Sequence, residues 1–328
     1  MLSDLLAPLI RRYQARRGRD EAEAVREMAT WSLDEWLRKQ GAGADARVMA
    51  RTLRGFFLAD PEELSVLPVV AQLADKGSPA ETPVYRIRGG NSRLLDALLS
   101  DTPARLLLRH EVKAIAQAAD RALVRLIDAA GLQQEIECDG VVLAVPATTL
   151  RHIDITPPLH DDQQKAIARL QYGRATKVVV QCASEGLRGR RAQAIATDGA
   201  LGAFWDATEG QPTGTKSVIN FLAGGSASPQ LRDVAARGAP ALLSDLCWLG
   251  LAGTPVVMSH RVTWEDDPFA RGGYAFADPA FDPAWKPLLS RRAGRIVFAG
   301  EHTSADFQGY MEGAVESGQR AALELINT

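Results

Sequence analysis

The stretch Gly294-Arg-Ile-Val-Phe-Ala-Gly-Glu301, followed by Gly309-Tyr-Met-Glu-Gly-Ala-Val-Glu-Ser-Gly318, decides the fold of this chain. The first segment has the short apolar run of a buried strand. The second has the composition of a helix whose start carries glycines. A strand, a turn and a helix in this order present backbone N–H groups and a positive helix dipole to an anionic group. The tail therefore predicts a binding site at the start of the last helix.

The composition is that of an ordinary globular chain. Its 328 residues include 38 Lys and Arg against 40 Asp and Glu, so no general attraction to nucleic acid or to an anionic membrane is expected. The basic runs 11–19 and 188–191 hold one aromatic residue, Tyr13, too few for a base-stacking surface. No apolar run approaches the length of a membrane span. Scattered histidines and cysteines indicate neither a metal site nor a disulfide framework, and a cytoplasmic compartment is expected.

The first part of the chain is predicted to be helical. Residues 1–80 carry helical apolar spacing, with Ser32 as an N-cap and Glu35 at the capping-box position. Between 76 and 83 the chain is polar and bears Pro and Gly, as expected for a crossing between domains. Asn91 fits the cap of a further helix.

Strand patterns dominate the next part. Strand-like runs cover 84–88, 106–115, 122–128 and 134–138. The run 141–146 is apolar on both faces, which is typical of a central strand in a covered sheet. A second α+β region then has a helix over 163–170, strands over 176–182, 217–222 and 256–264, and a long irregular segment at 265–287. Such long loops are often functional.

Four segments, in their order along the chain, resemble the flavin-containing amine oxidases, a monoamine oxidase-like family. They are 89–146, 172–181, 264–274 and the tail. The resemblance implies an α/β plus α+β fold, with an incomplete FAD-binding domain of Rossmann-like, glutathione-reductase type and a mixed-sheet and helical substrate domain. The implied two-domain architecture is discontinuous. Residues 1–83 and 150–290 form the substrate domain, and residues 84–149 and 291–328 form the FAD-binding domain.

The resemblance implies that the tail holds the flavin side of FAD. Glu301, which follows Gly300, would hydrogen-bond the ribityl hydroxyls. Gly309 would let the last helix approach the ring system closely. The amide of Met311 would face the N1/O2 edge of the flavin and favour the anionic reduced ring. Tyr310 would be one wall of an aromatic cage.

Other implied cofactor contacts lie earlier in the chain. Val112 would meet the adenine end of FAD through its backbone, and Pro146 ends the apolar run that belongs to the same site. Trp264 would lie near the flavin. Gly273 stands where the mammalian mitochondrial members carry the cysteine that attaches FAD, so the resemblance implies non-covalent FAD. Taken as residues alone, Val112 and Trp264 also fit simple core packing.

Three residues are the implied catalytic groups. Lys177 begins an apolar strand, and the resemblance implies that it holds a water at the flavin N5 and stabilises the charge that forms when reduced flavin meets oxygen. A lysine whose stem lies on the core and whose ammonium reaches solvent is the structural alternative. Tyr274 and Tyr310 would form facing walls that align an amine with the flavin.

The Gly-x-Gly-x-x-Gly turn that such enzymes use for the FAD pyrophosphate is not found in these residues. Gly41-Ala-Gly-Ala-Asp45 lacks the third glycine and follows no predicted strand. A parallel sheet without its first strand-helix unit exposes apolar edges and faces. We therefore expect a heteromer in which a separate small chain carries the dinucleotide-binding fold. A truncated form of a larger enzyme is the alternative.

The implied activity is FAD-dependent oxidation of the C–N bond of a small-molecule amine, by hydride transfer to flavin N5. We expect this chain to be inactive without its partner. Tyr310 favours amines, because amino-acid oxidases of the superfamily tend to carry tryptophan there. The alternatives are an L-amino-acid oxidase or flavin desaturase of the same superfamily, and a non-catalytic binding subunit.

Overall fold

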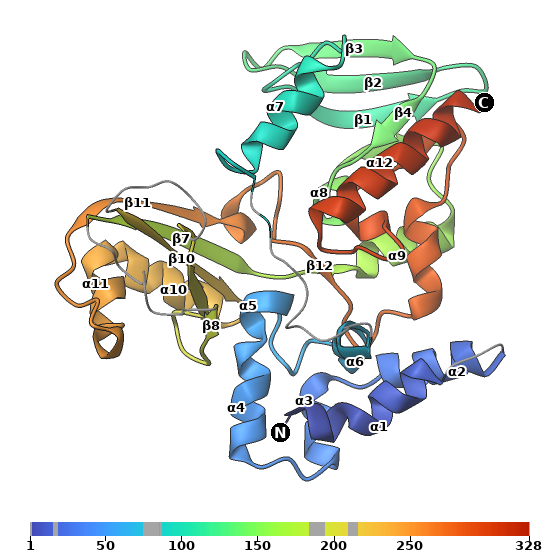
Figure 1. Ribbon diagram of the computed structural model, residues 1–328. Coiled ribbons are helices and arrows are strands. Elements are labelled where there is room, and N and C mark those ends of the chain that lie inside the picture. Colours follow the sequence, from blue (N-terminus) through green and yellow to red (C-terminus); the bar gives the residue numbers. More distant parts are fainter. Residues whose placement is uncertain are drawn as a thin grey trace.

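The computed structural model describes residues 2–15, 19–74, 85, 87–183, 194–208 and 216–327. The predicted crossing at 76–83 and the predicted strand at 84–88 fall largely outside these ranges, and the basic run 188–191 lies wholly outside them. In Figure 1 the molecule has a helical base, a sheet on one side of it and an upper layer of strands that carries the last helix.

The helical base confirms the prediction for the first part of the chain. Its helices are α1 (Leu2–Gln14), α2 (Arg19–Ala29), α3 (Leu33–Lys39), α4 (Ala44–Thr52), α5 (Arg54–Phe57) and α6 (Val66–Ala74). Ser32 is the N-cap of α3 and forms the complete capping box with Glu35. Leu6, Leu33 and Val70 are buried in one hydrophobic cluster, which Phe276 also joins. The base is thereby packed against a distant part of the sequence.

The upper layer begins with α7 (Ser92–Ser100) and a meander of β1 (Glu111–Gln117), β2 (Ala122–Ile127) and β3 (Gln133–Cys138). β5 (Asp154–Thr156) extends this sheet in parallel with β1. The strand predicted at 106–115 corresponds to β1, which begins later than expected, at Glu111. The helix after Asn91 is confirmed with Asn91 at its N-cap position, but the Asn91 side chain makes no capping bond. Its Nδ2 lies 3.6 Å from Sδ of Met311 instead.

The expectation of a covered central strand at 141–146 is wrong for the described chain. β4 (Val141–Leu143) pairs in parallel with β13 (Ile296–Phe298), and these strands form a two-stranded sheet. Val141 and Leu143 pack in the core, whereas the side chain of Val142 points to the opposite face and is 42% exposed. Within the described residues no further strand pairs with β4. After β13, η4 (Glu301–Thr303) leads to α12 (Met311–Ile326).

A five-stranded sheet forms the second α+β region. Its order is β11-β7-β10-β9-β8, with antiparallel pairing throughout. The strands are β7 (Ala175–Cys182), β8 (Ile195–Ala196), β9 (Ala203–Asp206), β10 (Ser217–Gly224) and β11 (Val256–Thr263), and the helices α10 (Ala227–Ala236) and α11 (Ala239–Ser244) cover one face. Phe204 and Phe221 are fully buried in the hydrophobic cluster between this sheet and the two helices.

The predicted irregular segment at 265–287 is mostly irregular, but it contains short elements. It includes η2 (Trp264–Asp266), the strand β12 (Ala275–Phe276), which pairs with β6 (Gln171–Tyr172), and the start of η3 (Pro283–Ser290). The helix predicted at 163–170 is α9 (Asp161–Arg169), and α8 (Ala147–Leu150) precedes it. Among the helices that the structure describes, none is both long and apolar enough to span a membrane.

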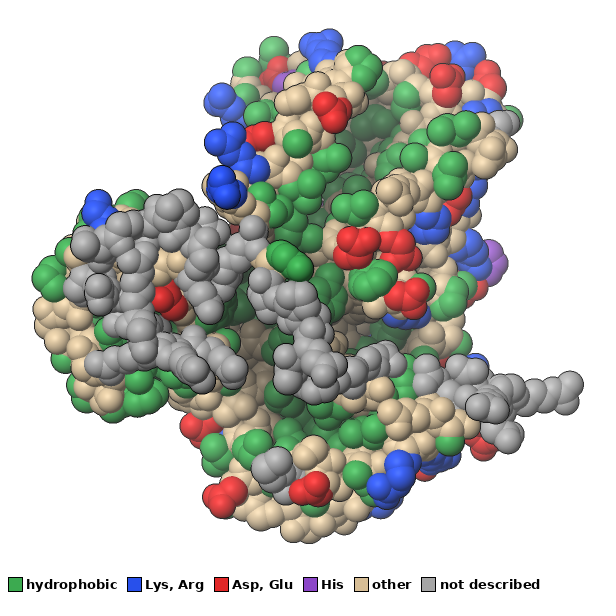
Figure 2. Space-filling view, viewed as in Figure 1, with side chains coloured by type: hydrophobic (Ala, Val, Ile, Leu, Met, Phe, Trp, Pro, Cys, Tyr) green, Lys and Arg blue, Asp and Glu red, His purple; other side chains and the backbone are tan. Residues whose placement is uncertain are grey.

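Figure 2 shows hydrophobic side chains lining a hollow in the upper layer, between the regions where Figure 1 places α7 and α12. Exposed apolar residues on α7, on α12 and on the neighbouring strand β4 include Leu95, Leu98, Val315, Leu323 and Val142. α7 has no buried residue among those described. A contiguous apolar face of this kind marks a surface that normally packs against something else.

Replacement of Phe221 by alanine tests the core of the five-stranded sheet. Phe221 is fully buried, and its ring centroid lies 5.9 Å from that of Phe204. We expect the Phe221→Ala variant to lower the free energy of unfolding by about 3 to 5 kcal/mol, because it leaves a cavity. Urea denaturation followed by circular dichroism measures this change. Phe269→Ala, at a largely exposed ring, is the control. An equal effect of the two substitutions would contradict the assignment of this core.

Candidate active site

The chain passes from β13 to α12 through two glycines with left-handed backbone. Gly300 has a φ of 111° and Gly309 a φ of 84°, values that residues with a Cβ rarely adopt. The Gly300 N–H donates to Oγ of Ser317 at 3.0 Å. Arg320 donates through Nη2 to the Phe298 carbonyl at 2.8 Å. The start of this connection is therefore fixed against the helix that follows it.

Glu301 joins this connection to β12. Its Oε1 accepts the N–H of Ala275 at 3.2 Å, and its Oε2 accepts the N–H of Gly309 at 2.5 Å. Burial raises the pKa of the Glu301 carboxyl, whereas the two amide hydrogen bonds and the nearby Lys286 lower it. The side chain that the resemblance assigns to the ribityl hydroxyls thus also holds two backbone segments together.

Tyr274 and Tyr310 lie at the two segments that Glu301 joins. Tyr274 directly precedes β12, and its hydroxyl donates to the Phe56 carbonyl. Tyr310 is the N-cap of α12 and is 46% exposed. A Cβ placed on Gly309 would lie 3.7 Å from Cδ2 of Tyr274, so the backbone beside Tyr310 is close to the Tyr274 ring. Burial raises the pKa of Tyr274, and the nearby Tyr310 and Glu301 raise it further.

The segment that begins with Trp264 is tied to the start of β7. The Trp264 carbonyl accepts the N–H of Gly272 at 3.1 Å, which closes the segment into a loop. The next residue, Glu265, accepts the N–H of Ala175 at 2.8 Å. Trp264 is half-buried at the start of η2. These bonds fix where the loop leaves the sheet, and so where Tyr274 emerges.

Lys177 lies on the face of β7 that points away from α10 and α11. Its neighbour Val178 packs in the core of the sheet, and side chains alternate along a strand. Nζ of Lys177 lies 5.8 Å from the centroid of the Trp205 ring, within the range of a cation–π interaction. Burial lowers the pKa of the Lys177 ammonium. The sequence analysis missed Trp205, because only the pairing of β7, β10 and β9 brings it near Lys177.

Val112 and Pro146 lie in the upper layer. Val112 is in β1, next to a register shift, and packs against the cluster that contains Leu143 and Phe298. Pro146 is the N-cap of α8, and the following amide, that of Ala147, donates to the Tyr172 hydroxyl at 3.1 Å. Val112 therefore belongs to the core that supports β4 and β13, and Pro146 begins the helix that follows β4.

Two titratable groups next to the tail, the half-buried Lys286 and the buried His302, were not predicted. The Lys286 Nζ donates to the Ala305 carbonyl at 2.7 Å, and burial lowers its pKa. His302 is buried under the connection, with its ring centroid 6.3 Å from that of Tyr172. Burial lowers the pKa of His302 to about 4. Lys286 thus bonds η3 to the connection, and His302 packs within it near Tyr172; the sequence signals only that His302 directly follows Glu301.

The start of α12 fits the edge of a flavin ring. First-turn N–H groups of a helix have no partner within the helix, and Met311 is the first residue of α12. Met311 is 49% exposed, and Tyr310 beside it is 46% exposed. Gly313 packs so closely on the Phe307 carbonyl that no Cβ would fit there. The first-turn amides, the positive helix end and an exposed aromatic ring together suit a planar group that gains negative charge.

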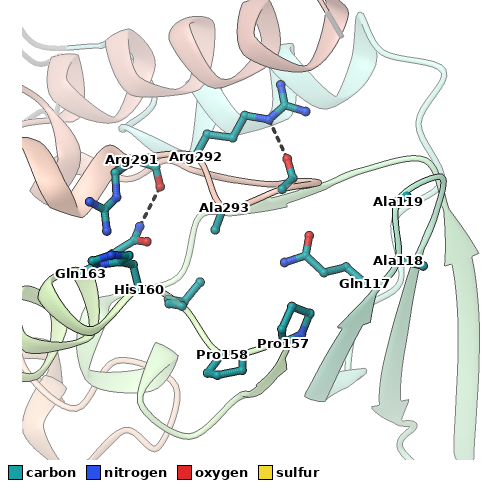
Figure 3. A pocket seen from close by; sticks show the side chains of 12 residues that line it. Gln117, Ala118, Ala119, Pro157, Pro158, His160, Gln163, Arg291, Arg292 and Ala293 are labelled. Carbon is teal, nitrogen blue, oxygen red and sulfur yellow. Dashed lines mark hydrogen bonds between the residues drawn. The ribbon is translucent and has the colours of Figure 1, made fainter.

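A separate cavity of about 650 Å³ lies at the other end of the upper layer and is drawn in Figure 3. It contains none of the predicted site residues. Its lining groups are already paired within the protein: Gln163 donates to the Arg291 carbonyl at 2.7 Å, and Arg292 donates to the Gly294 carbonyl at 2.7 Å. Across the described ranges, no cluster of His, Cys, Asp or Glu could hold a metal ion.

The architecture and the tail define the class of this protein. The family model for flavin containing amine oxidoreductases matches residues 3–326, and this chain belongs to that family. Membership identifies FAD as the cofactor and confirms the fold and the resemblance found in the sequence. It also supports oxidoreductase activity on amines as the general function of the family.

Individual relatives agree with this assignment. The chain is 24% identical to a pseudooxynicotine dehydrogenase from Pseudomonas sp over 93% of its own length and 60% of the relative's. It is 29% identical to an L-amino-acid oxidase from Mus musculus over 74% of its own length and 39% of that protein's. The chain thus spans less than two thirds of the length of each of these relatives.

Solved structures share the fold. A cyclohexylamine oxidase from Brevibacterium oxydans IH-35A superposes with a TM-score of 0.81 at 20% identity, over 99% of this chain and 74% of that one. A wild-type putrescine oxidase bound to putrescine gives a TM-score of 0.80 at 19% identity, over 100% of this chain and 74% of that one. About a quarter of each of those chains has no counterpart here.

The buried His302 predicts a pH dependence of stability. The unfolded chain binds a proton near the ordinary histidine pKa of 6.5, whereas the folded chain does so only near 4. The contribution of neutral His302 to the free energy of unfolding is therefore fully present above pH 6.5. It is lost as the pH drops towards 4, and this loss amounts to roughly 3 kcal/mol. Urea denaturation at pH 7 and pH 4.5 measures the loss. The His302→Asn variant should lose less between these pH values than the wild type, and the exposed-site control His152→Asn should behave like the wild type. Equal losses in all three proteins would be the contrary result.

Proposed function

We propose that this chain carries the flavin-side and substrate-side residues of an FAD-dependent enzyme that oxidises the C–N bond of an amine. One observation carries the proposal: Tyr274, Tyr310 and the open start of α12 meet at one place, where Glu301 joins their segments. When bound, FAD would accept a hydride from the carbon next to the amine nitrogen.

The side chains divide the work between orientation and charge. Tyr274 is held by its bond to the Phe56 carbonyl, and Tyr310 faces solvent at the helix start. Burial keeps Tyr274 protonated, so its ring meets a neutral amine without a competing phenolate. Lys177 is the proposed cation for the oxygen reaction, since its ammonium is half-buried and the described residues give it only Trp205 as a partner. Gly273 supports non-covalent binding of FAD.

The substrate class follows from the tyrosines and is tested directly. An amine is the first candidate, and the putrescine bound in a structural relative supports it. An amino acid is the second, because a mouse L-amino-acid oxidase is among the relatives. Anaerobic addition of primary amines should bleach the visible absorbance of the flavin-loaded protein, and amino acids should do so at least tenfold more slowly. Bleaching by amino acids alone would favour the second candidate. A flavin-loaded protein that neither reduces would favour a non-catalytic subunit.

We further propose that a strand–turn–helix segment from a separate small chain completes the cofactor site. The free edge of β4, the exposed Val142 and the apolar hollow of Figure 2 support this, because a parallel sheet is normally covered on both faces. The partner would supply the Gly-rich turn that binds the pyrophosphate. Free thiols at all three cysteines suit a cytoplasmic location.

A charge on the β4 face tests the docking of this segment. In the complex purified from the native host, Val142→Lys should lower the retained flavin roughly tenfold or more, because burial of an unpaired ammonium is costly. Flavin content per chain and the amount of co-purified polypeptide measure the effect. Leu132→Lys is the matched control, since Leu132 is also exposed and lies in the β2–β3 turn. Full flavin retention and an unchanged partner yield in Val142→Lys would rule out this docking face.

Removal of the Lys177 charge tests its role with oxygen. In the flavin-loaded complex, Lys177→Met should slow reoxidation by oxygen by roughly 100-fold, the usual effect of losing one electrostatic group at a developing charge. Reduction by the amine should change little. Stopped-flow absorbance follows the two half-reactions separately. Lys216→Met, at an exposed lysine before β10, is the control. Unchanged reoxidation in Lys177→Met would remove the residue from the mechanism.

A further inference from the structure

The geometry points to Glu301 as a positioning residue that sets the separation of Tyr274 and Tyr310 through the backbone. It touches the residue after Tyr274 and the residue before Tyr310, accepting one amide N–H from each. The catalytic meaning of this arrangement rests on the proposed function, but the arrangement itself does not. This role differs from a contact with the cofactor, since Glu301 would act through the tyrosines.

The two bonds require a carboxylate of this length. One oxygen lies 3.2 Å from the Ala275 nitrogen, and the other lies 2.5 Å from the Gly309 nitrogen. An ionised carboxylate accepts at both oxygens, whereas a glutamine amide offers one acceptor and turns a donor towards the second N–H. Aspartate keeps the charge but is one methylene shorter. Glutamine and aspartate therefore each remove one of the two properties that the arrangement needs.

Neighbouring bonds close the same unit. The Ala275 carbonyl accepts from Nε2 of Gln308 at 3.2 Å, so Ala275 is held on both its backbone groups by the connection before α12. The positive φ of Gly309 turns the chain so that its N–H faces Glu301. Lys286, bonded to the Ala305 carbonyl, lies close enough to Glu301 to lower the pKa of its carboxyl. This offsets part of the rise in pKa that burial causes. With Glu301 removed, the Gln308 side-chain bond to Ala275 would still join the two segments.

The consequence for the site is a fixed gap between two aromatic side chains. Tyr310 is 46% exposed at the helix start, so packing alone does not fix its position. The hydrogen bond from the Gly309 N–H to Glu301 fixes it instead, because Gly309 directly precedes Tyr310. A shift of about 1 Å in such a wall can cost roughly 100-fold in rate when alignment of the substrate matters. Glu301 would therefore act on the reaction without touching the amine.

Hydrogen–deuterium exchange of the chain without flavin tests the arrangement itself. In Glu301→Gln, the peptides that contain Ala275 and Gly309 should exchange about tenfold faster in at least one of the two segments, and in Glu301→Ala in both. Glu301→Asp should resemble Glu301→Gln. Glu62→Gln, the same change at an exposed glutamate, is the control and should leave both peptides unchanged. Circular dichroism establishes that each variant is folded, and unchanged exchange in folded Glu301→Gln and Glu301→Asp would overturn the proposal.

Kinetics of the complex saturated with FAD then test the role in catalysis. We expect Glu301→Gln to lower kcat/KM for a primary amine about tenfold or more, with reoxidation by oxygen unchanged. Faster exchange with unchanged kcat/KM would overturn the positioning role while leaving the proposed function intact. If the wild-type complex oxidises no amine, the proposed function fails, and the exchange data still decide whether Glu301 holds the two segments.

Discussion

The parallel pairing of β13 with β4 is the constraint on which the candidate site depends. It sets Phe298 beside Leu143, although the two strands are far apart in the sequence. Parallel strands end at the same edge of a sheet, so the chain leaves β13 towards Gly300 where the other strand leads to Pro146 and α8. The segment before β12 is bonded to the same place, because Thr148 donates to the Ala270 carbonyl at 2.7 Å. Three distant segments therefore meet at one edge.

Polar groups add to apolar burial in fixing this edge, most of all on the side that faces α12. The cluster formed by β13 and α12 contains few fully buried side chains, Val297, Ala299 and Ala321, whereas the five-stranded sheet has a far larger core. Arg320 and Glu301 supply what the small cluster lacks, since each bonds two separated parts of the chain. Charge-assisted hydrogen bonds of this kind are directional, and therefore fix positions as well as adding stability.

Local signals predicted the elements, and non-local pairing decided the details of the site. The capping box at Ser32 and the strand that carries Lys177 depend on neighbouring residues, so the sequence was sufficient for both. The position of Trp205 near Lys177 depends on a three-strand register. The N–H groups that donate to Glu301 depend on how two loops approach each other. The apolar run 141–146 predicted a covered strand that the described chain leaves open at Val142, because such a pattern does not say which chain covers it.

The exposed face of β4 and the hydrogen bonds of Glu301 act on the same element, because both involve α12 or its start. The described two-stranded sheet of β4 and β13 has a small apolar cluster towards α12, so the layer gains stability when apolar surface is added at Val142 and along α12. A segment docked there would bury the same helix whose first turn receives the flavin edge. Because each ligand would then favour the conformation that the other binds, segment and flavin would strengthen each other's binding by linkage. Glu301 stands where these effects converge, since it connects the start of that helix to the substrate side of the molecule.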